Sequence, residues 1–350
     1  MLAADSKVVV AHSTDPLDSE VAYSWKQIVE PVEPFLEAVH SRLAKQVTEF
    51  DPAISPYADY ALNGRGKHLR PALVALTANA LGELNDSHVT VAMIIEMVHL
   101  ATLVHDDVMD ESEIRRGRPT LAASWGNEIA VLFGDCLFAQ ALKLAASFPT
   151  PEICRAVAMA TNTVCSGEIL QTQHRGNFQL SHGEYFRVLE MKTAELFALS
   201  SELAAYLSGA SPAQCAASRQ FGLAFGTAYQ LYDDCMDLFG SEIVAEKSLG
   251  TDLAKGKLTL PVLLLWERAV PKDRARLEAL IQNWQESAMA QVGAMLSQYD
   301  TLPPSIQSIH HYLERARQML RGMPESHGRS CLHGLTKHLA RQTDALILCA

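Results

Sequence analysis

Apolar residues recur at three- and four-residue spacing along most of this 350-residue chain. That spacing gathers them on one face of an α-helix, so a series of such segments predicts an all-α protein. No segment alternates apolar and polar residues convincingly enough to predict a strand. After a first helix that begins near Val21 or Pro31, the predicted helices occupy residues 71–81, 89–110, 128–147, 152–172, 183–207, 212–239, 259–268 and 274–297.

Turn-forming residues separate these segments, and no break is long or low in complexity. Examples are Asn63 with Gly64, Gly117 with Pro119, and Pro212 after a serine. Short connections favour helices that pack against their neighbours in one bundle. We therefore expect a mobile lead-in at residues 1–20 and a single all-helical domain over 21–350, with 301–350 as a final helical hairpin.

Composition narrows the class of protein. Hydrophobic residues make up 48% of the chain and charged residues 20%, which allows a large buried core. The net charge of −11 argues against a general nucleic-acid binder, because such a protein needs a basic face to displace counterions from phosphates. We expect no transmembrane segment, because the longest continuous apolar run after the N-terminus, at 258–266, is about half a membrane span and contains Pro261. Seven scattered cysteines without a CxxC pair favour reduced thiols in the cytoplasm.

Two acidic motifs carry the strongest functional signal. DDVMD places Asp106 and Asp110 one helical turn apart at the polar end of an apolar helix. DDCMD repeats the arrangement with Asp233 and Asp237 at the end of a second apolar helix. Like charges this close repel one another unless a cation lies between them, and carboxylate oxygens without histidine or cysteine suit Mg²⁺. The predicted metal-binding residues are Asp106, Asp107, Asp110, Asp233, Asp234 and Asp237.

Basic residues lie where a diphosphate would need them. Lys67 and Arg70 stand in a glycine-containing turn just before a predicted helix, and Arg115 with Arg116 follow the first acidic motif by about one turn. Taken alone, each pair is typical of a solvated surface. Beside carboxylates that bind a metal, both pairs become candidate partners of phosphate groups.

From about Gly64 to Pro261 the chain resembles the trans-isoprenyl diphosphate synthase family. GKHLRP is similar to that family's GKRxRP motif, HDDVMDESEIRRG to its first aspartate-rich motif with the arginines that follow, and YQLYDDCMD to its second. The resemblance implies an isoprenoid-synthase bundle around a central apolar cavity, and a homodimer. It also implies Mg²⁺, three ions per active site, and the condensation of isopentenyl diphosphate with an allylic diphosphate.

The resemblance also implies roles for single residues. Lys67, Arg70, His99 and Arg116 would hold isopentenyl diphosphate. The allylic diphosphate would be held by Arg115, Lys192, Lys247 and Lys257, and its cation would be stabilised by the oxygens of Thr193 and Gln230. The catalytic set that follows is Asp106, Asp110, Asp233, Lys192, Thr193 and Gln230.

Two positions depart from the family pattern. His68 stands where an arginine is usual, which makes the isopentenyl pocket less positive or sensitive to pH. Leu258 stands where the family's KPTLP motif has proline, so the backbone beside Lys257 is less certain. His99 as a core histidine and Gln230 as a helix cross-link are alternative interpretations of those residues.

Product length should depend on the residues one and two turns before Asp106, which point down the expected apolar tunnel. Met97, Val98, Ala101 and Thr102 occupy these positions, and none is aromatic. Short-chain members carry Phe or Tyr at the position of Ala101, so we expect a medium- or long-chain polyprenyl diphosphate. Geranylgeranyl diphosphate is the alternative if the tunnel is closed early by a side chain of other helices: Phe133, Phe138, Ile153 or Val157.

Two other classes share parts of this pattern. A terpene cyclase has one DDxxD motif but usually an NSE-type second metal motif, and the intact DDCMD opposes that hypothesis. A non-catalytic subunit of a heteromeric synthase typically loses acids from one motif, whereas all six aspartates are present. A chain-elongating synthase fits both observations better.

Overall fold

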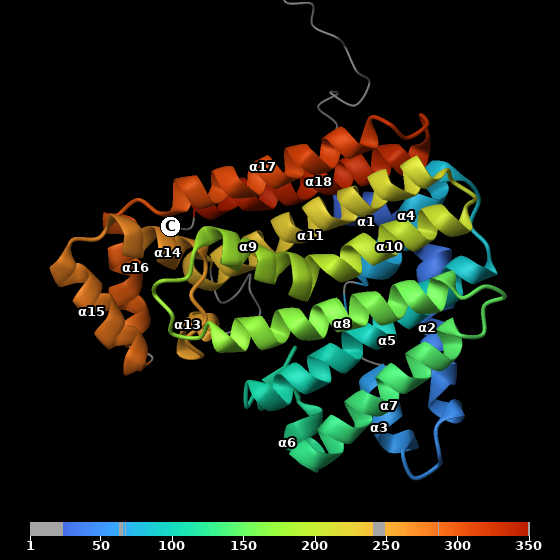
Figure 1. Cartoon of the computed structure of the whole chain (residues 1–350), viewed down its shortest axis with the longest axis horizontal. Coiled ribbons are helices and arrows are strands. Elements are labelled where there is room, and N and C mark those ends of the chain that lie inside the picture. The colour runs from blue at the N-terminus through green and yellow to red at the C-terminus, as the bar shows by residue number, and fades with distance from the viewer. Residues whose placement is uncertain (1–23, 63–65, 67, 241–248, 286, 349–350) are drawn as a thin grey trace, which may run out of the picture.

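The computed structural model describes residues 24–62, 66, 68–240, 249–285 and 287–348, and these are almost entirely helical (Figure 1). The expected lead-in at 1–20 lies outside the described residues. The α-helices are α1 (Trp25–Val29), α2 (Glu33–Gln46), α3 (Ser55–Leu62), α4 (Leu69–Leu81), α5 (Asp86–Met109), α6 (Leu121–Trp125), α7 (Asn127–Ala145), α8 (Glu152–Gln173), α9 (His182–Leu189), α10 (Glu195–Leu207), α11 (Pro212–Phe239), α13 (Thr251–Ala254), α14 (Leu260–Arg268), α15 (Pro271–Gln282), α16 (Ala288–Gln298), α17 (Leu302–Leu320) and α18 (His327–Ala345). Short 3₁₀ turns, η2 (Glu30–Val32), η3 (Val47–Glu49) and η5 (Leu346–Leu348), and one π-helical turn, η4 (Glu190–Ala194), complete the helical elements.

The predicted all-α class is confirmed, and α17 with α18 forms the expected C-terminal hairpin. Two expectations were wrong in detail. Residues 274–297 form two helices, because α15 ends at Gln282 and the Asn283 side chain bonds back to the carbonyl of Ala279. A hairpin of two-residue strands, β1 (Ile114–Arg115) and β2 (Arg118–Pro119), follows α5, and strands this short cannot show an alternating pattern.

The two helices that end in the acidic motifs begin with strong caps. Asn85 accepts hydrogen bonds from the first-turn backbone of α5, and Ser211 does the same for α11. Pro212 stands in the first turn of α11, where its missing N–H is not needed. From its cap, each helix runs through the core to its polar end. The cap therefore helps to fix the position of the acidic motif at that end.

One hydrophobic cluster runs through the described residues from Ile28 to Leu346. In Figure 1, α17 and α18 lie along the top of the bundle, while α15 and α16 lie at its left end. Helix α5 is long and apolar enough to cross a membrane, but 67% of its apolar 18-residue stretch is buried inside the protein, as in the core helix of a bundle. Because the cluster is continuous, we propose that residues 21–350 fold as one domain.

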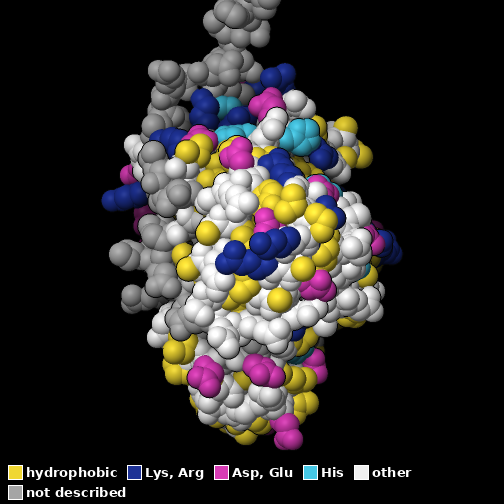
Figure 2. All heavy atoms as spheres, turned by 90° about the vertical axis from the view of Figure 1, so that its left-hand side faces the viewer, with side chains coloured by type: hydrophobic (Ala, Val, Ile, Leu, Met, Phe, Trp, Pro, Cys, Tyr) yellow, Lys and Arg dark blue, Asp and Glu magenta, His cyan; other side chains and the backbone are white. Residues whose placement is uncertain are grey.

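Figure 2 shows the end of the molecule where α15 and α16 lie. On that face, basic side chains lie in separate groups, with acidic and apolar side chains between them. A nucleic acid would need a continuous basic surface. This face therefore agrees with the argument from net charge.

Close backbone packing between α10 and α11 generates a stability prediction. A Cβ added to Gly222 of α11 would overlap the backbone of Phe197 in α10, whereas a Cβ on Gly293 of α16 would meet nothing within 4 Å. Gly222→Ala should lower the free energy of unfolding by about 1–3 kcal/mol through overpacking. Gly293→Ala, the matched control, should raise it by about 0.5–1 kcal/mol through helix propensity. Chemical denaturation measures both, and equal effects of the two changes would contradict this packing.

Candidate functional site

A cavity of about 1260 Å³ lies among α4, α5, α8, η4, α10 and α11. It collects most of the predicted site residues from segments far apart in the sequence. Those that line it are Arg70, His99, Thr102, Asp106, Asp110, Arg115, Arg116, Lys192, Thr193, Gln230, Asp233 and Lys257. Lys67 and Lys247 lie outside the described residues.

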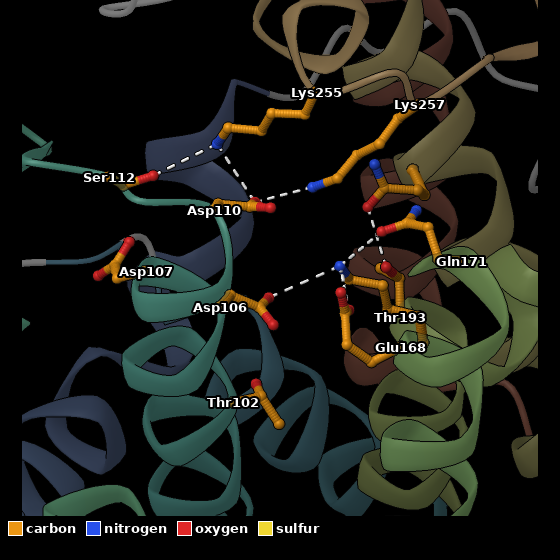
Figure 3. A network of polar contacts seen from close by, with 12 residues as sticks. Thr102, Asp106, Asp107, Asp110, Ser112, Glu168, Gln171, Thr193, Lys255 and Lys257 are labelled. Carbon is orange, nitrogen blue, oxygen red and sulfur yellow. Dashed lines mark hydrogen bonds and ion pairs between the residues drawn. The ribbon is translucent and has the colours of Figure 1, made fainter. Parts of the chain in front are cut away.

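The first acidic motif sends its side chains to two places. Asp106 and Asp110 line the cavity, while Asp107 points away from them (Figure 3). The Asp107 carboxylate is buried, accepts a hydrogen bond of 2.8 Å from Nε of Arg115, and forms an ion pair with Nη2 of the same residue at 2.8 Å. Arg115 thus stabilises the end of α5 through Asp107, the carboxylate that points away from the other two.

Asp110 receives three cationic side chains. Lys257 Nζ lies 2.8 Å and Lys255 Nζ 3.2 Å from its carboxylate (Figure 3). Arg175 Nη2 lies 2.8 Å from the same carboxylate. Burial acts to raise the pKa of Asp110, but the hydrogen bonds and charges of the two lysines outweigh it and lower that pKa. For Asp106 burial wins over the charge of Lys192, so its pKa is raised. The two carboxyl groups therefore lie in different electrostatic environments although they are one turn apart.

The second motif is divided in the same way. Asp233 lines the cavity, whereas the buried Asp234 accepts hydrogen bonds from the Tyr185 hydroxyl and, at 2.8 Å, from Gln230 Nε2. Burial, followed by the charge of Asp252, raises the pKa of Asp234. Of the two carboxylates, Asp233 is the one placed to meet a ligand in the cavity.

Asp237 faces the start of α13. Its carboxylate accepts hydrogen bonds from Thr251 Oγ1 at 2.8 Å and from the backbone N–H of Asp252 at 3.1 Å. These bonds fix the segment that leads to Lys255 and Lys257. Of the six aspartates, Asp106, Asp110 and Asp233 line the cavity, whereas Asp107, Asp234 and Asp237 do not line it and are held by protein donors.

Lys192 and Thr193 stand on the π-helical turn between α9 and α10. Such turns insert one residue into a helix and redirect its side chains, often at functional sites. Lys192 Nζ thereby reaches Asp106 at 3.7 Å, and Thr193 Oγ1 donates to Gln230 Oε1 at 3.0 Å. The turn brings two helices of the cavity wall, α5 and α11, within reach of one segment.

A second polar group lies around Arg70, whose guanidinium stacks over the Phe197 ring at 4.7 Å. Burial lowers the pKa of His99 to about 3, so its ring is neutral at physiological pH. Burial acts to raise the pKa of Glu96, but the hydrogen bond with His68, the electrostatic interaction with the His99 ring and the charge of Arg70 outweigh it and bring that pKa to about 2. His68 Nδ1 lies 3.5 Å from Glu96, so the residue that departs from the family pattern contacts an acid beside Arg70.

The β1–β2 hairpin separates the two arginines. Its turn residues Arg116 and Gly117 both have positive φ, 51° and 72°, as a type I′ turn requires. Arg115 points to Asp107, while Arg116 lies against Gly66 at the start of the segment that carries Arg70. Adjacent residues thus serve opposite sides of the cavity.

Sequence reasoning missed five residues of the site. Lys255 repeats the charge of Lys257 two positions earlier, which is a signal in the sequence. Glu168 and Gln171 are spaced to share one face of α8, so a search for polar side chains inside the predicted helices would have found both. Arg175 and Tyr185 follow no pattern in the sequence. Their roles depend on where distant segments meet.

The proposed chain-length residues are not equally placed. Thr102 lines the cavity and donates to the carbonyl of His99 at 2.7 Å, whereas the other three are buried in the core and do not line it: Met97, Val98 and Ala101. Among the side chains considered as early stops, Phe138 lines the cavity, while the rest are buried: Phe133, Ile153 and Val157.

Comparison with known proteins agrees with this geometry. The family model described as polyprenyl synthetase matches residues 51–298. The chain is 33% identical over 313 residues to octaprenyl diphosphate synthase of Haemophilus influenzae, covering 89% of this chain and 95% of the relative. It is 34% identical over 319 residues to the geranyl-diphosphate-specific all-trans-nonaprenyl-diphosphate synthase of Rhodobacter capsulatus, covering 91% and 98%.

A solved structure shows the same fold. The polyprenyl synthase of Caulobacter crescentus, complexed with calcium and isoprenyl diphosphate, superposes with a TM-score of 0.86 at 31% identity. The match covers 92% of this chain and 99% of that one. The isoprenoid-synthase fold and the resemblance found in the sequence motifs are both confirmed, and the chain belongs to the polyprenyl synthetase family of chain-elongating prenyltransferases.

Proposed function

We propose that this prenyltransferase condenses isopentenyl diphosphate with an allylic diphosphate, in a Mg²⁺-dependent head-to-tail reaction, to give a medium- or long-chain trans-polyprenyl diphosphate. The observation that carries the proposal is one cavity that holds carboxylates of two helices, Asp106 and Asp233, between two separate groups of basic side chains. Two basic groups suit two diphosphates, as a condensation requires. A cyclase needs only one.

The allylic diphosphate would lie beside Asp106 and Asp110. Lys192 and Lys257 already contact these carboxylates, so their ammonium groups are within reach of a phosphate held there. Arg115 and Lys247 are further candidates from the family pattern, although Arg115 contacts Asp107 and Lys247 lies outside the described residues. These cations would hold the leaving group and favour cleavage of its C–O bond.

The residues present fit Mg²⁺. The carboxylates of Asp106, Asp110 and Asp233 offer hard oxygen ligands from two sides of the cavity. Within the described ranges, no three Asp, Glu, His or Cys side chains converge closely enough to hold an ion alone, which suits a metal that completes its shell with water and phosphate. When bound, Mg²⁺, in three sites by family analogy, would neutralise the diphosphate and make it a better leaving group.

Isopentenyl diphosphate would lie in the second group, held by Arg70, Arg116 and, from the family pattern, Lys67. Because His99 is neutral, its contribution would be a hydrogen bond rather than a charge. Arg70 is fixed by its stacking on Phe197, so it is pre-organised for a phosphate. The separation of the two groups keeps the diphosphates apart while their carbon chains meet.

Carbocation chemistry needs an environment that excludes water and offers only weak nucleophiles. The bond from Thr193 to Gln230 and the bond from Gln230 to Asp234 fix both side chains at the cavity wall. Their oxygens would stabilise the allylic cation without attacking it. By family analogy, the released diphosphate would accept the proton lost from the condensed product.

The product-length proposal rests on the small side chain of Thr102 and on relatives named for octaprenyl and nonaprenyl products. Geranylgeranyl diphosphate is the alternative product, and the position of Phe138 in the cavity lining is the observation that favours it.

We further propose that the chain is a cytoplasmic homodimer. The family resemblance and four exposed apolar side chains on α7 and α8 support the dimer: Val131, Leu132, Met159 and Ile169, which are 41–65% exposed. A second copy packed on this helix pair would remove them from water.

The first prediction concerns activity. With Mg²⁺, labelled isopentenyl diphosphate and geranyl, farnesyl or geranylgeranyl diphosphate, the purified chain should form elongated product, and EDTA should abolish it. Asp106→Asn and Asp233→Asn should each lower kcat by about a hundredfold or more. Glu278→Gln, a matched loss of charge on α15, should not. No elongation from any primer would contradict the proposal, and a cyclised hydrocarbon without isopentenyl diphosphate would favour a cyclase.

The second prediction concerns product length. Thr102→Phe should shorten the main product by at least one isoprene unit, because the ring would enter the cavity beside Asp106. Ala101→Phe places its ring in a fully packed core instead and should lower the melting temperature. Chromatographic sizing of the products and thermal unfolding separate the two effects. Unchanged product length in folded Thr102→Phe would contradict this assignment of the tunnel.

A third prediction concerns assembly. Light scattering should give the purified protein twice the mass of one chain, and Leu132→Glu combined with Met159→Glu should convert it to a monomer by burying unpaired charge at the interface. Val270→Glu, at an exposed apolar residue before α15, is the control and should leave the mass unchanged. A monomeric wild-type chain, or a dimer that survives the double change, would contradict the proposed interface.

A further inference from the structure

Three oxygen-bearing side chains surround the Lys192 ammonium (Figure 3). It forms a close ion pair with Glu168, donates to Gln171 Oε1 at 2.8 Å, and lies 3.7 Å from Asp106 Oδ2. Glu168 and Gln171 are three residues apart on α8, so they project from the same face. The lysine is therefore attached mainly to α8, although it comes from η4 and faces α5.

The distances show which acid Lys192 prefers. Its pair with Glu168 is shorter than a normal hydrogen bond, while its separation from Asp106 exceeds hydrogen-bond length. All three side chains are largely shielded from solvent, with 12–20% of each exposed, so the charges act at a low effective dielectric. Glu168 and Asp106 therefore both attract the ammonium, and in this competition Glu168 makes the closer contact.

That competition affects the site. An ammonium in direct contact with Asp106 would occupy a carboxylate proposed to bind a cation, and it would turn away from the diphosphate. The ion pair with Glu168 prevents this, because it keeps the Lys192 ammonium 3.7 Å from Asp106 Oδ2.

We propose that Glu168 is a positioning residue, which with Gln171 holds Lys192 toward the allylic diphosphate and keeps Asp106 available to a metal ion. This inference rests on the proposed function, and it adds a residue outside both acidic motifs. The competing account is a structural link that only ties α8 to η4. The two differ in what they require, since a link needs a hydrogen-bond acceptor whereas positioning needs the negative charge.

Glu168→Gln separates these accounts, because it keeps the acceptor and the shape but removes the charge. We expect KM for the allylic diphosphate to rise about tenfold, while KM for isopentenyl diphosphate changes less than about twofold. The melting temperature should change little. Calorimetric binding of a non-reactive allylic thiolodiphosphate should weaken by the same factor, which gives a readout independent of turnover.

The double change Glu168→Gln with Gln171→Glu is the rescue variant. It returns the carboxylate to the other α8 position that contacts Lys192, so most of the lost affinity for the allylic diphosphate should return. Glu190→Gln is the control, because Glu190 lies on the same π-helical turn and neighbours Arg315 rather than the cavity. It should leave both KM values unchanged. Glu168→Asp, which keeps the charge but withdraws it by one methylene, should give an intermediate effect.

Four results would overturn the inference: unchanged KM values in Glu168→Gln, equal rises in both KM values, a large fall in melting temperature, or no recovery in the double variant. If Glu168→Gln fails to fold, Glu168→Asp still decides, since positioning requires it to bind the analogue more weakly than the wild type, and unchanged binding would overturn the inference. A wild-type chain that does not elongate any primer would instead refute the proposed function. The two failures are therefore distinguishable.

Discussion

The concentration of negative charge at the ends of two buried helices is the constraint on which the rest of the structure depends. Helices α5 and α11 both end in acidic motifs, and a helix C-terminus already carries partial negative charge. Their apolar faces hold these ends inside the bundle, so the acids cannot be left to solvent. Cations contact Asp107 and Asp110, and hydrogen-bond donors contact Asp234 and Asp237.

The groups that meet this charge come mainly from irregular parts of the fold. Lys192 stands on a π-helical turn, Arg115 on a short hairpin, and Lys255 with Lys257 between two helices. Irregular segments can aim a side chain where a continuous helix would not, and the surrounding bundle keeps them rigid. Because of this arrangement, each motif has at least one carboxylate that faces the cavity and at least one that is held by donors of the protein. This division lets one part of each motif act on substrate while the rest supports the backbone.

Much of this was predictable from the sequence, because helical periodicity fixes which face of a segment is buried. The bounds of α8 and α11, and the pairing of Asp106 with Asp110 on one helix face, followed from spacing, whereas Asp233 was assigned to the same site by the repeated motif and the family resemblance. Periodicity could not tell that Asp107 and Asp234 are bound by Arg115 and Tyr185, since those donors come from other elements. Nor could it choose Thr102 over Ala101, because adjacent residues on a helix differ by 100° in direction and the tunnel's position depends on neighbouring helices.

The central claim is that Asp106 and Asp233 act on one allylic diphosphate, through metal ions that their carboxylates would hold. Calorimetric binding of a non-reactive allylic thiolodiphosphate to the wild type, Asp106→Asn, Asp233→Asn and the double variant, each with and without Mg²⁺, tests it most directly. The account predicts tight binding only with Mg²⁺, a loss of about tenfold or more in each single variant, and a double variant little worse than either, because each change disrupts the same assembly. Equal affinity in EDTA, or losses that simply add, would contradict it.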